Sequence, residues 1–174
     1  LMAGYNDIAM AAIGIVLKAE RLPLNVGIGI CQGMMPIIAY NNSAKNYKRT
    51  KDTIKYSLII GLIVSAFSLL IYETAARYII KVFISEAQTV SLGTNFIRIR
   101  ILATPLMFCS FFITHVFQGF GEGNIALFLG VMRWAVFNIP MLFILNYFIG
   151  MYGIVWSQAV ADMLTVTLSL IVFY

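Results

Sequence analysis

Lys18, Glu20 and Arg21 place three charged side chains close together inside a long apolar stretch of the sequence. At about 100° per helical residue, Lys18 and Arg21 share a face, and Glu20 projects about 200° from Lys18. Charges within a membrane usually mark a substrate or ion pathway or an ion pair. The three residues would line a water-filled cavity that binds a charged substrate, or lie at the outer interface, where long side chains reach water. The sequence leaves both interpretations open.

The other isolated polar side chains in apolar stretches also allow more than one interpretation. His115, the only histidine, would relay protons, because histidine titrates near neutral pH, or would hydrogen-bond a neighbouring helix. Arg98 and Arg100 are two residues apart and point to nearly opposite helix faces, as anchors at the interface or partners in interhelical salt bridges. Arg133 lies about eight residues from the inner end of its expected helix, and Asp162 lies about nine residues from the outer end of the next helix. We therefore expect the two side chains at different depths and expect no pair between them.

Residue types needed for enzyme chemistry are sparse. One histidine and two well-separated cysteines, Cys31 and Cys109, cannot form a metal site, and we expect both thiols to be small buried apolar groups. The segment GIGICQG resembles a dinucleotide fingerprint only superficially, because no strand precedes it. We therefore expect a protein that is not an enzyme and holds no cofactor and no metal.

The composition indicates an integral membrane protein. The 174 residues are 61% hydrophobic and 11% charged, and the mean hydropathy is +0.90. Soluble domains are about 45–50% apolar and about 25% charged. Uncharged runs of about 17–25 residues, the length that crosses a bilayer, recur along the chain. We predict an all-α, multi-pass bundle in the cell membrane; a soluble chain with an oversized core is the alternative.

Positive charge is concentrated in one short segment. Five basic residues between Lys45 and Lys55 face a single acid, Asp52, directly after an apolar run that begins near Gly27. Cytoplasmic loops carry an excess of Lys and Arg, so we expect residues 42–52 to be a cytoplasmic loop. This topological signal accounts for much of the net charge of +5, and we expect no nucleic-acid partner.

The apolar runs predict five helices, at about 8–40, 53–83, 94–119, 125–148 and 154–174, all within one unit covering residues 1–174. Apolar sequence at both ends suggests part of a longer chain. Asp7 is the expected N-cap of the first helix. Residues 84–93 are expected to form a connector, with Ser85 as the N-cap of a short turn within it. Glu73, Arg77 and Lys81 are expected to pair along one helix face.

Prolines lie within several of these helices. Pro36, Pro105 and Pro140 are candidate kinks that would let helices bend. Pro23 is expected to kink the long first helix; two shorter helices meeting near residues 18–23 are the alternative.

An ordered series of short motifs resembles the C-terminal half of a multidrug and toxic compound extrusion (MATE) transporter, most closely the bacterial DinF-like branch. No single motif is decisive, but their order and spacing are specific, and they cover nearly the whole chain. They are Gly14-Ile15, Lys18 and Glu20; Gly29, Gln32 and Pro36; Ser43-Ala44-Lys45-Asn46; Ile97–Arg100; Gln118-Gly119 with Gly121; Arg133 with Pro140; Gly153–Trp156; and Ala161-Asp162.

This resemblance implies one six-helix lobe of a twelve-helix, two-lobe transporter, with most of the lobe's first helix missing. A central cavity between the lobes would alternate its access, exchanging H⁺ or Na⁺ for organic compounds, often cationic. The implied partners are small organic substrates, membrane lipid and the N-terminal lobe.

Two features depart from the family pattern. Some sodium-coupled members have an acid in the middle of the helix expected at 94–119, where this chain has Met107, Cys109 and Ser110. In the DinF-like branch the coupling acid is expected in the other lobe. Asn42-Ser43 replaces the commoner Tyr-Gly before Ala44-Lys45. The coupling ion therefore stays open.

The leading hypothesis is a secondary antiporter that exports drugs or metabolites. Its alternatives are a flippase for lipid-linked oligosaccharide, which needs a more cationic cavity, and a membrane scaffold without transport. The candidate residues of the substrate and ion cavity are Lys18, Glu20, Arg21, Asn25, Gln32, His115 and Gln118.

Overall fold

The computed structural model describes residues 2–173, without the side chains of Ala3 and Phe173. These residues form a short 3₁₀ turn, η1 (Met2–Gly4), a π-helical stretch, η2 (Met132–Asn138), and seven α-helices. The α-helices are α1 (Asp7–Ser43), α2 (Tyr47–Phe83), α3 (Ala87–Leu102), α4 (Thr104–Gly119), α5 (Gly123–Val131), α6 (Ile139–Ile149) and α7 (Met151–Phe173).

Four continuous helical segments are long and apolar enough to cross a membrane: α1, α2, the run from α5 through η2 to α6, and α7. The bent pair α3–α4 would be a fifth crossing. Large apolar side chains such as Ile63, Phe67 and Leu70 on α2 and Phe143 on α6 are exposed, as expected of surfaces that face lipid or another part of a membrane protein. The predicted all-α membrane bundle is confirmed.

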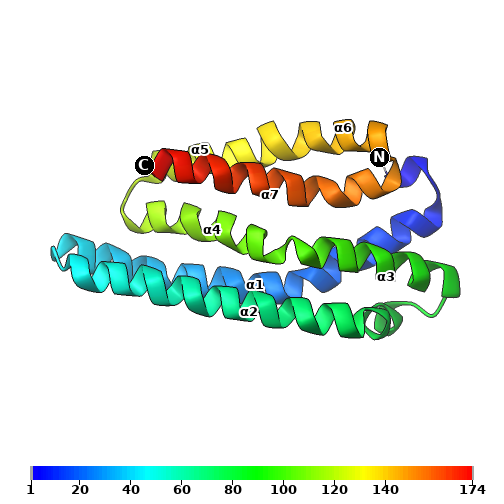
Figure 1. Ribbon diagram of the computed structural model, residues 1–174, viewed down its shortest axis with the longest axis horizontal. Coiled ribbons are helices and arrows are strands. Elements are labelled where there is room, and N and C mark those ends of the chain that lie inside the picture. The colour runs from blue at the N-terminus through cyan, green and yellow to red at the C-terminus, as the bar shows by residue number, and fades with distance from the viewer. Residues whose placement is uncertain (1, 174) are drawn as a thin grey trace.

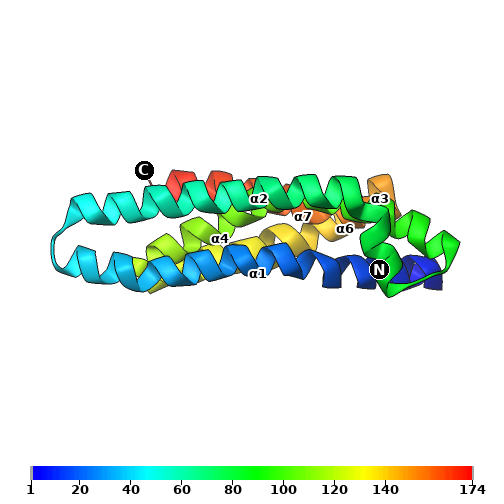
Figure 2. The same ribbon diagram turned by 90° about the horizontal axis from the view of Figure 1, so that it is seen from below.

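The helices run back and forth along the long axis of the molecule (Figure 1). α1 and α2 form an antiparallel hairpin at one side, α3 and α4 lie in the middle, and α5, α6 and α7 form the other side. Seen from below, α1 and α2 lie side by side in front of the remaining helices (Figure 2). α4 packs against both α1 and α7 and thus joins the two sides.

The turn between α1 and α2 is shorter than the sequence predicts. α1 continues to Ser43 and α2 begins at Tyr47, so most of the basic segment expected as a loop at 42–52 is helical. α2 begins this early because Asn46 is its N-cap residue, and the Asn46 side chain accepts the Arg49 N–H at 3.3 Å. At the start of α1 the cap is Asn6, whose side chain accepts the Ala9 N–H at 2.6 Å, so the prediction of Asp7 was wrong.

The connector between α2 and α3 is also shorter than the expected 84–93, because α3 begins at Ala87. The N-cap residue of α3 is Glu86, and Ser85 precedes it in the connector. Within the expected helix 94–119, α3 and α4 meet at Ala103 at an angle of 44°. Pro105 lies in the first turn of α4, where its missing N–H costs no hydrogen bond. The bend thus lies two residues before Pro105, the candidate kink.

The remaining prolines are accommodated within helices. Pro23 and Pro36 lie inside the single helix α1, so the alternative of two shorter helices was wrong. Pro140 is the second residue of α6, which follows directly on η2, the π-helical stretch. A proline removes one backbone donor and crowds the carbonyl four residues before it, and a local π stretch is a common way to absorb such a defect.

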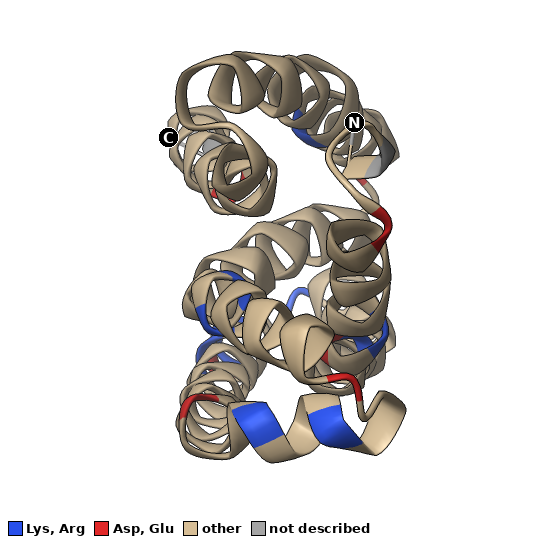
Figure 3. Ribbon diagram, turned by 90° about the vertical axis from the view of Figure 1, so that its right-hand side faces the viewer, with Lys and Arg blue, Asp and Glu red and all other residues tan. Residues whose placement is uncertain are grey.

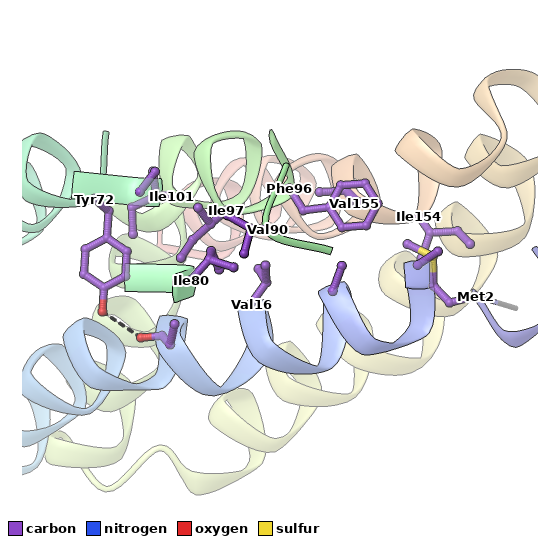
Figure 4. Packing of buried hydrophobic residues seen from close by; sticks show 14 residues of the cluster. Met2, Val16, Tyr72, Ile80, Val90, Phe96, Ile97, Ile101, Ile154 and Val155 are labelled. Carbon is purple, nitrogen blue, oxygen red and sulfur yellow. Dashed lines mark hydrogen bonds between the residues drawn. The ribbon is translucent and has the colours of Figure 1, made fainter. Parts of the chain in front are cut away.

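The largest buried cluster joins α1, α2, α3 and α7 (Figure 4). Small side chains on α1, among them Ala9, Ala12 and Ala19, are fully buried there and allow close approach of neighbouring helices. The Tyr72 hydroxyl of α2 donates to the Ala19 carbonyl oxygen of α1 at 2.7 Å, a bond drawn in Figure 4. This bond fixes α2 against α1 near the charged residues at 18–21.

Gly61 on α2 packs directly against the Phe108 ring of α4. A Cβ added there would overlap the Phe108 ring, so we expect Gly61→Ala to destabilise the protein by about 1–3 kcal/mol through overpacking. Gly33→Ala is the matched control, because nothing lies within 4 Å of a Cβ at that position on α1. Unfolding of the full-length protein in detergent measures both variants, and equal stability would contradict the packing argument.

Candidate functional site

A cavity of about 470 Å³ opens between α1, α3, α4, η2, α6 and α7. Much of its wall is apolar or aromatic, and a few polar groups point into it. The lining residues are Ile13, Leu17, Glu20, Arg21, Leu24, Arg100, Met107, Phe111, Trp134, Asn138, Leu142, Ile154, Ser157 and Gln158. We call this space the central cavity. Cavities that bind small molecules commonly combine an apolar wall with a few fixed polar groups.

Glu20 and Arg100 form a nearly buried ion pair in the wall of the central cavity. The Arg100 Nε donates to Glu20 Oε2 at 2.5 Å and its Nη2 donates to Glu20 Oε1 at 3.2 Å. The side chains are 10% and 6% exposed for Arg100 and Glu20. A two-point contact of this kind orients both groups. It joins α1 to α3 and leaves a carboxylate at the edge of an apolar space.

A second buried pair lies between η2 and α7. Arg133 Nε donates to Asp162 Oδ1 at 2.7 Å, and the two side chains are 4% and 0% exposed. The prediction that these residues are unpaired was wrong. Arg133 lies 17 residues before Gly150 and Asp162 lies 12 after it, a difference of only about 7.5 Å in helical rise. The two depths were counted from different membrane surfaces, which hid how small their difference is. The long arginine side chain spans the remaining distance of about 7.5 Å.

The second pair continues as a chain of hydrogen bonds to the central cavity. The Gln158 amide donates to Asp162 Oδ2 at 3.1 Å, and the Asn138 amide donates to Gln158 Oε1 at 2.8 Å. Gln158 and Asn138 both line the cavity. The Arg133 guanidinium also lies 4.0 Å from the centre of the Phe111 ring. Arg133 and Asp162 therefore hold in place several side chains that form the cavity wall.

Of the residues predicted for the site, the structure brings only Glu20 and Arg21 to the central cavity. Lys18, Asn25, Gln32 and Gln118 are exposed and do not line it. His115 Nδ1 lies 2.7 Å from the Phe111 carbonyl oxygen, one turn earlier on the same helix. This contact is within α4, and proton relay and an interhelical bond through the other ring nitrogen both stay predictions.

Sequence reasoning missed Arg100, Asn138 and Gln158 as parts of the site. Arg100 and Arg98 do point to different partners, as the two-residue spacing indicated: Arg100 pairs with Glu20, and Arg98 lies 3.5 Å from Glu73. The Glu73 partner thus comes from another helix and not from the expected pairing along α2. Asn138 and Gln158 gave no signal beyond their polarity in an apolar stretch.

Metal chemistry finds no support in residues 2–173, where no group of three or more His, Cys, Asp or Glu side chains could hold an ion. The multi-helix bundle with its apolar spans and its polar-edged cavity defines the class as a helical membrane protein. The MatE family model matches residues 1–144. The chain belongs to this family, the multidrug and toxic compound extrusion family.

Relatives in sequence and in structure agree with this assignment. The multidrug export protein MepA of Staphylococcus saprophyticus is 28% identical over 99% of the chain, and MepA of Staphylococcus haemolyticus is 29% identical over the same share. The chain spans 38% of each relative. A MATE crystal structure in the bent conformation superposes with a TM-score of 0.88 at 18% identity, over 97% of this chain and 38% of that one. An outward-facing multidrug resistance MATE family transporter gives 0.86 at 15% identity, over 92% of this chain and 37% of that one.

Proposed function

We propose that the full protein to which this chain belongs is a secondary antiporter that exports amphipathic or cationic organic compounds in exchange for H⁺ or Na⁺. In this proposal the chain is the C-terminal lobe, and the central cavity faces the other lobe and alternates its access. Besides the substrate and the N-terminal lobe, the proposal requires the coupling ion and no further cofactor. The membrane is the plasma membrane, with the basic turn between α1 and α2 on its cytoplasmic side.

The observation that carries this proposal is the carboxylate of Glu20 at the edge of an aromatic and apolar wall. Phe111, Trp134 and Met107 offer ring faces and a flexible side chain to an organic cation. Glu20 binds Arg100 and would exchange that partner for a proton, a sodium ion or the cation of a substrate. Export of several drugs is named for the MepA relatives, which supports the same substrate class here.

The same cavity gives less support to a flippase for lipid-linked oligosaccharide. Four cations in apolar stretches of the sequence, Lys18, Arg21, Arg98 and Arg133, would favour that function if they lined the cavity. Among them only Arg21 lines the central cavity, while Arg133 is neutralised by Asp162. In the central cavity a pyrophosphate would therefore contact Arg21, a cation without an ion pair among residues 2–173, together with Arg100, which is already paired with Glu20. The negative charge of Glu20 would repel it.

The proposal is tested with the full-length protein in efflux-deficient cells loaded with ethidium. We expect dye efflux to stop when one gradient, of H⁺ or of Na⁺, is collapsed, and to continue when the other is collapsed, because exchange needs its counter-ion. Empty-vector cells give the background rate. Absence of efflux under every gradient, despite good expression in the membrane, would contradict the proposed drug export.

A further inference from the structure

A second cavity, of about 520 Å³, lies where α2 ends and α3 begins. It shares no lining residue with the central cavity. We call it the terminal pocket. Its lining residues are Arg77, Lys81, Ser85, Ala87, Val90, Ser91, Thr94, Asn95 and Arg98.

The terminal pocket concentrates positive charge. Arg77 and Lys81 are one helical turn apart on α2, so they share a face, and Arg98 approaches from α3. None of the lining residues is acidic. The nearby acid Glu73 lies 3.5 Å from Arg98 in an exposed pair, with side chains 33% and 51% exposed. A second acid, Glu86, stands between the lining residues Ser85 and Ala87. Three cations thus face two carboxylates, and the region keeps a net positive charge. Figure 3 views the molecule from this end, with Lys and Arg in blue and Asp and Glu in red.

The position of these cations is unusual for a membrane protein. Lys51 and Arg77 are 26 residues apart on α2, or about 39 Å along a helix. This exceeds the hydrocarbon thickness of about 30 Å, so the basic turn and the terminal pocket lie at opposite membrane surfaces. Positive charge normally gathers on one side only. A second cluster on the opposite side calls for a local cause, and an anionic ligand would relieve its repulsion.

The groups around the cations suit a phosphate. Ser85, Ser91 and Asn95 bring hydroxyl and amide donors to the pocket. Ala87, the first residue of α3, also lines it, and the N-cap residue Glu86 makes no capping bond with its side chain. The Glu86 carboxylate instead accepts the Thr89 hydroxyl at 2.6 Å. The first N–H groups of a helix have no intrahelical acceptor and favour an anion.

Apolar side chains beside the cations indicate a lipid. Tyr78 and Val82 directly follow Arg77 and Lys81 in the sequence and are 74% and 82% exposed. The last turns of α2 therefore present cations next to bare apolar surface, as a headgroup and its acyl chains require, and tyrosine commonly lies at the membrane interface. We propose that the terminal pocket binds the phosphate of an anionic phospholipid in the outer leaflet.

The test measures lipid binding to the full-length protein in neutral detergent, by native mass spectrometry and by the shift in thermal unfolding midpoint. Phosphatidylglycerol is the probe, and phosphatidylcholine and inorganic phosphate are the other two arms. We expect the double variant Arg77→Ala/Lys81→Ala to bind phosphatidylglycerol at least tenfold more weakly. Arg77→Lys/Lys81→Arg keeps both charges and should bind within about threefold of the unmodified protein. Unfolding without lipid checks that the variants are folded.

The matched control is Lys48→Ala/Lys51→Ala, which removes the same charge from exposed positions at the other end of α2. Its phosphatidylglycerol affinity should stay within about twofold of the unmodified protein. The proposal is overturned by unchanged binding to Arg77→Ala/Lys81→Ala, by an equal loss in the control, or by equally tight binding of phosphatidylcholine. Inorganic phosphate at millimolar concentration is the last arm. If it binds as tightly as phosphatidylglycerol and loses its binding in Arg77→Ala/Lys81→Ala, the pocket is a site for free phosphate and the lipid proposal is overturned.

Discussion

Asp162→Asn is expected to destabilise the folded protein by about 3–5 kcal/mol, because it leaves a buried arginine without its counter-charge. Arg133 is 3% exposed, so water cannot solvate its freed charge. The change also weakens the bond between Asp162 and Gln158, which helps to hold the cavity wall. Equilibrium unfolding of the full-length protein in detergent measures the loss, with expression level in the membrane as a second readout.

Glu73→Gln is the matched control for Asp162→Asn. It removes one carboxylate from an ion pair with Arg98 whose side chains are 33% and 51% exposed, and exposed pairs contribute about 0–1 kcal/mol. The double variant Arg133→Met/Asp162→Leu removes both buried charges and should be more stable than Asp162→Asn, because an apolar replacement of a buried pair is often tolerated. If Asp162→Asn and Glu73→Gln lower the free energy of unfolding equally, the argument is contradicted, because the charge of Arg133 would then be as well solvated as that of Arg98.

Glu20→Gln is expected to reduce efflux at least tenfold while expression in the membrane stays intact, because Arg100, unlike Arg133, lines the open central cavity, where water can solvate its charge. The amide keeps the size of the side chain but cannot exchange a proton or neutralise a cation, and Arg100 loses its ionic partner in the cavity wall. Initial rates of dye efflux under an imposed gradient measure the effect, normalised to the amount of protein in the membrane.

Lys18→Gln is the control for Glu20→Gln, because Lys18 lies on the same turn of α1 but is exposed and does not line the central cavity. It should transport at a rate close to that of the unmodified protein. Undiminished efflux in Glu20→Gln would remove Glu20 from the mechanism. Loss of membrane expression in that variant would show that its pair with Arg100 acts in folding, and binding of the dye to purified protein would then separate the two roles.

Helix bounds were the less accurate part of the sequence analysis. The pattern of apolar residues indicated the helices, because membrane crossings need long uncharged runs. It could not indicate that α2 begins at Tyr47, since the cap depends on the Asn46 side chain reaching the Arg49 N–H. Nor could it reveal the π-helical stretch before Pro140, because the backbone there adapts to its neighbours.

The candidate site was predictable only in part. Glu20 and Arg21 stood out because charges in an apolar run are costly and rarely without a role. Lys18 has the same signal and is exposed to the surroundings, since a helix rotates neighbouring residues to different faces. Asn138 and Gln158 have ordinary polar side chains, and only their contact with each other and with Asp162 shows their place in the cavity wall.

The amino-acid sequence by itself determined that this chain is a helical membrane protein, because its long uncharged runs are stable only in a bilayer as helices with internally satisfied backbones. It also determined which charges would need partners. Only the tertiary structure decided the partners: Glu20 with Arg100 and Arg133 with Asp162. Such pairing depends on the depth and rotation of helices that lie far apart in the sequence, and side-chain packing sets both.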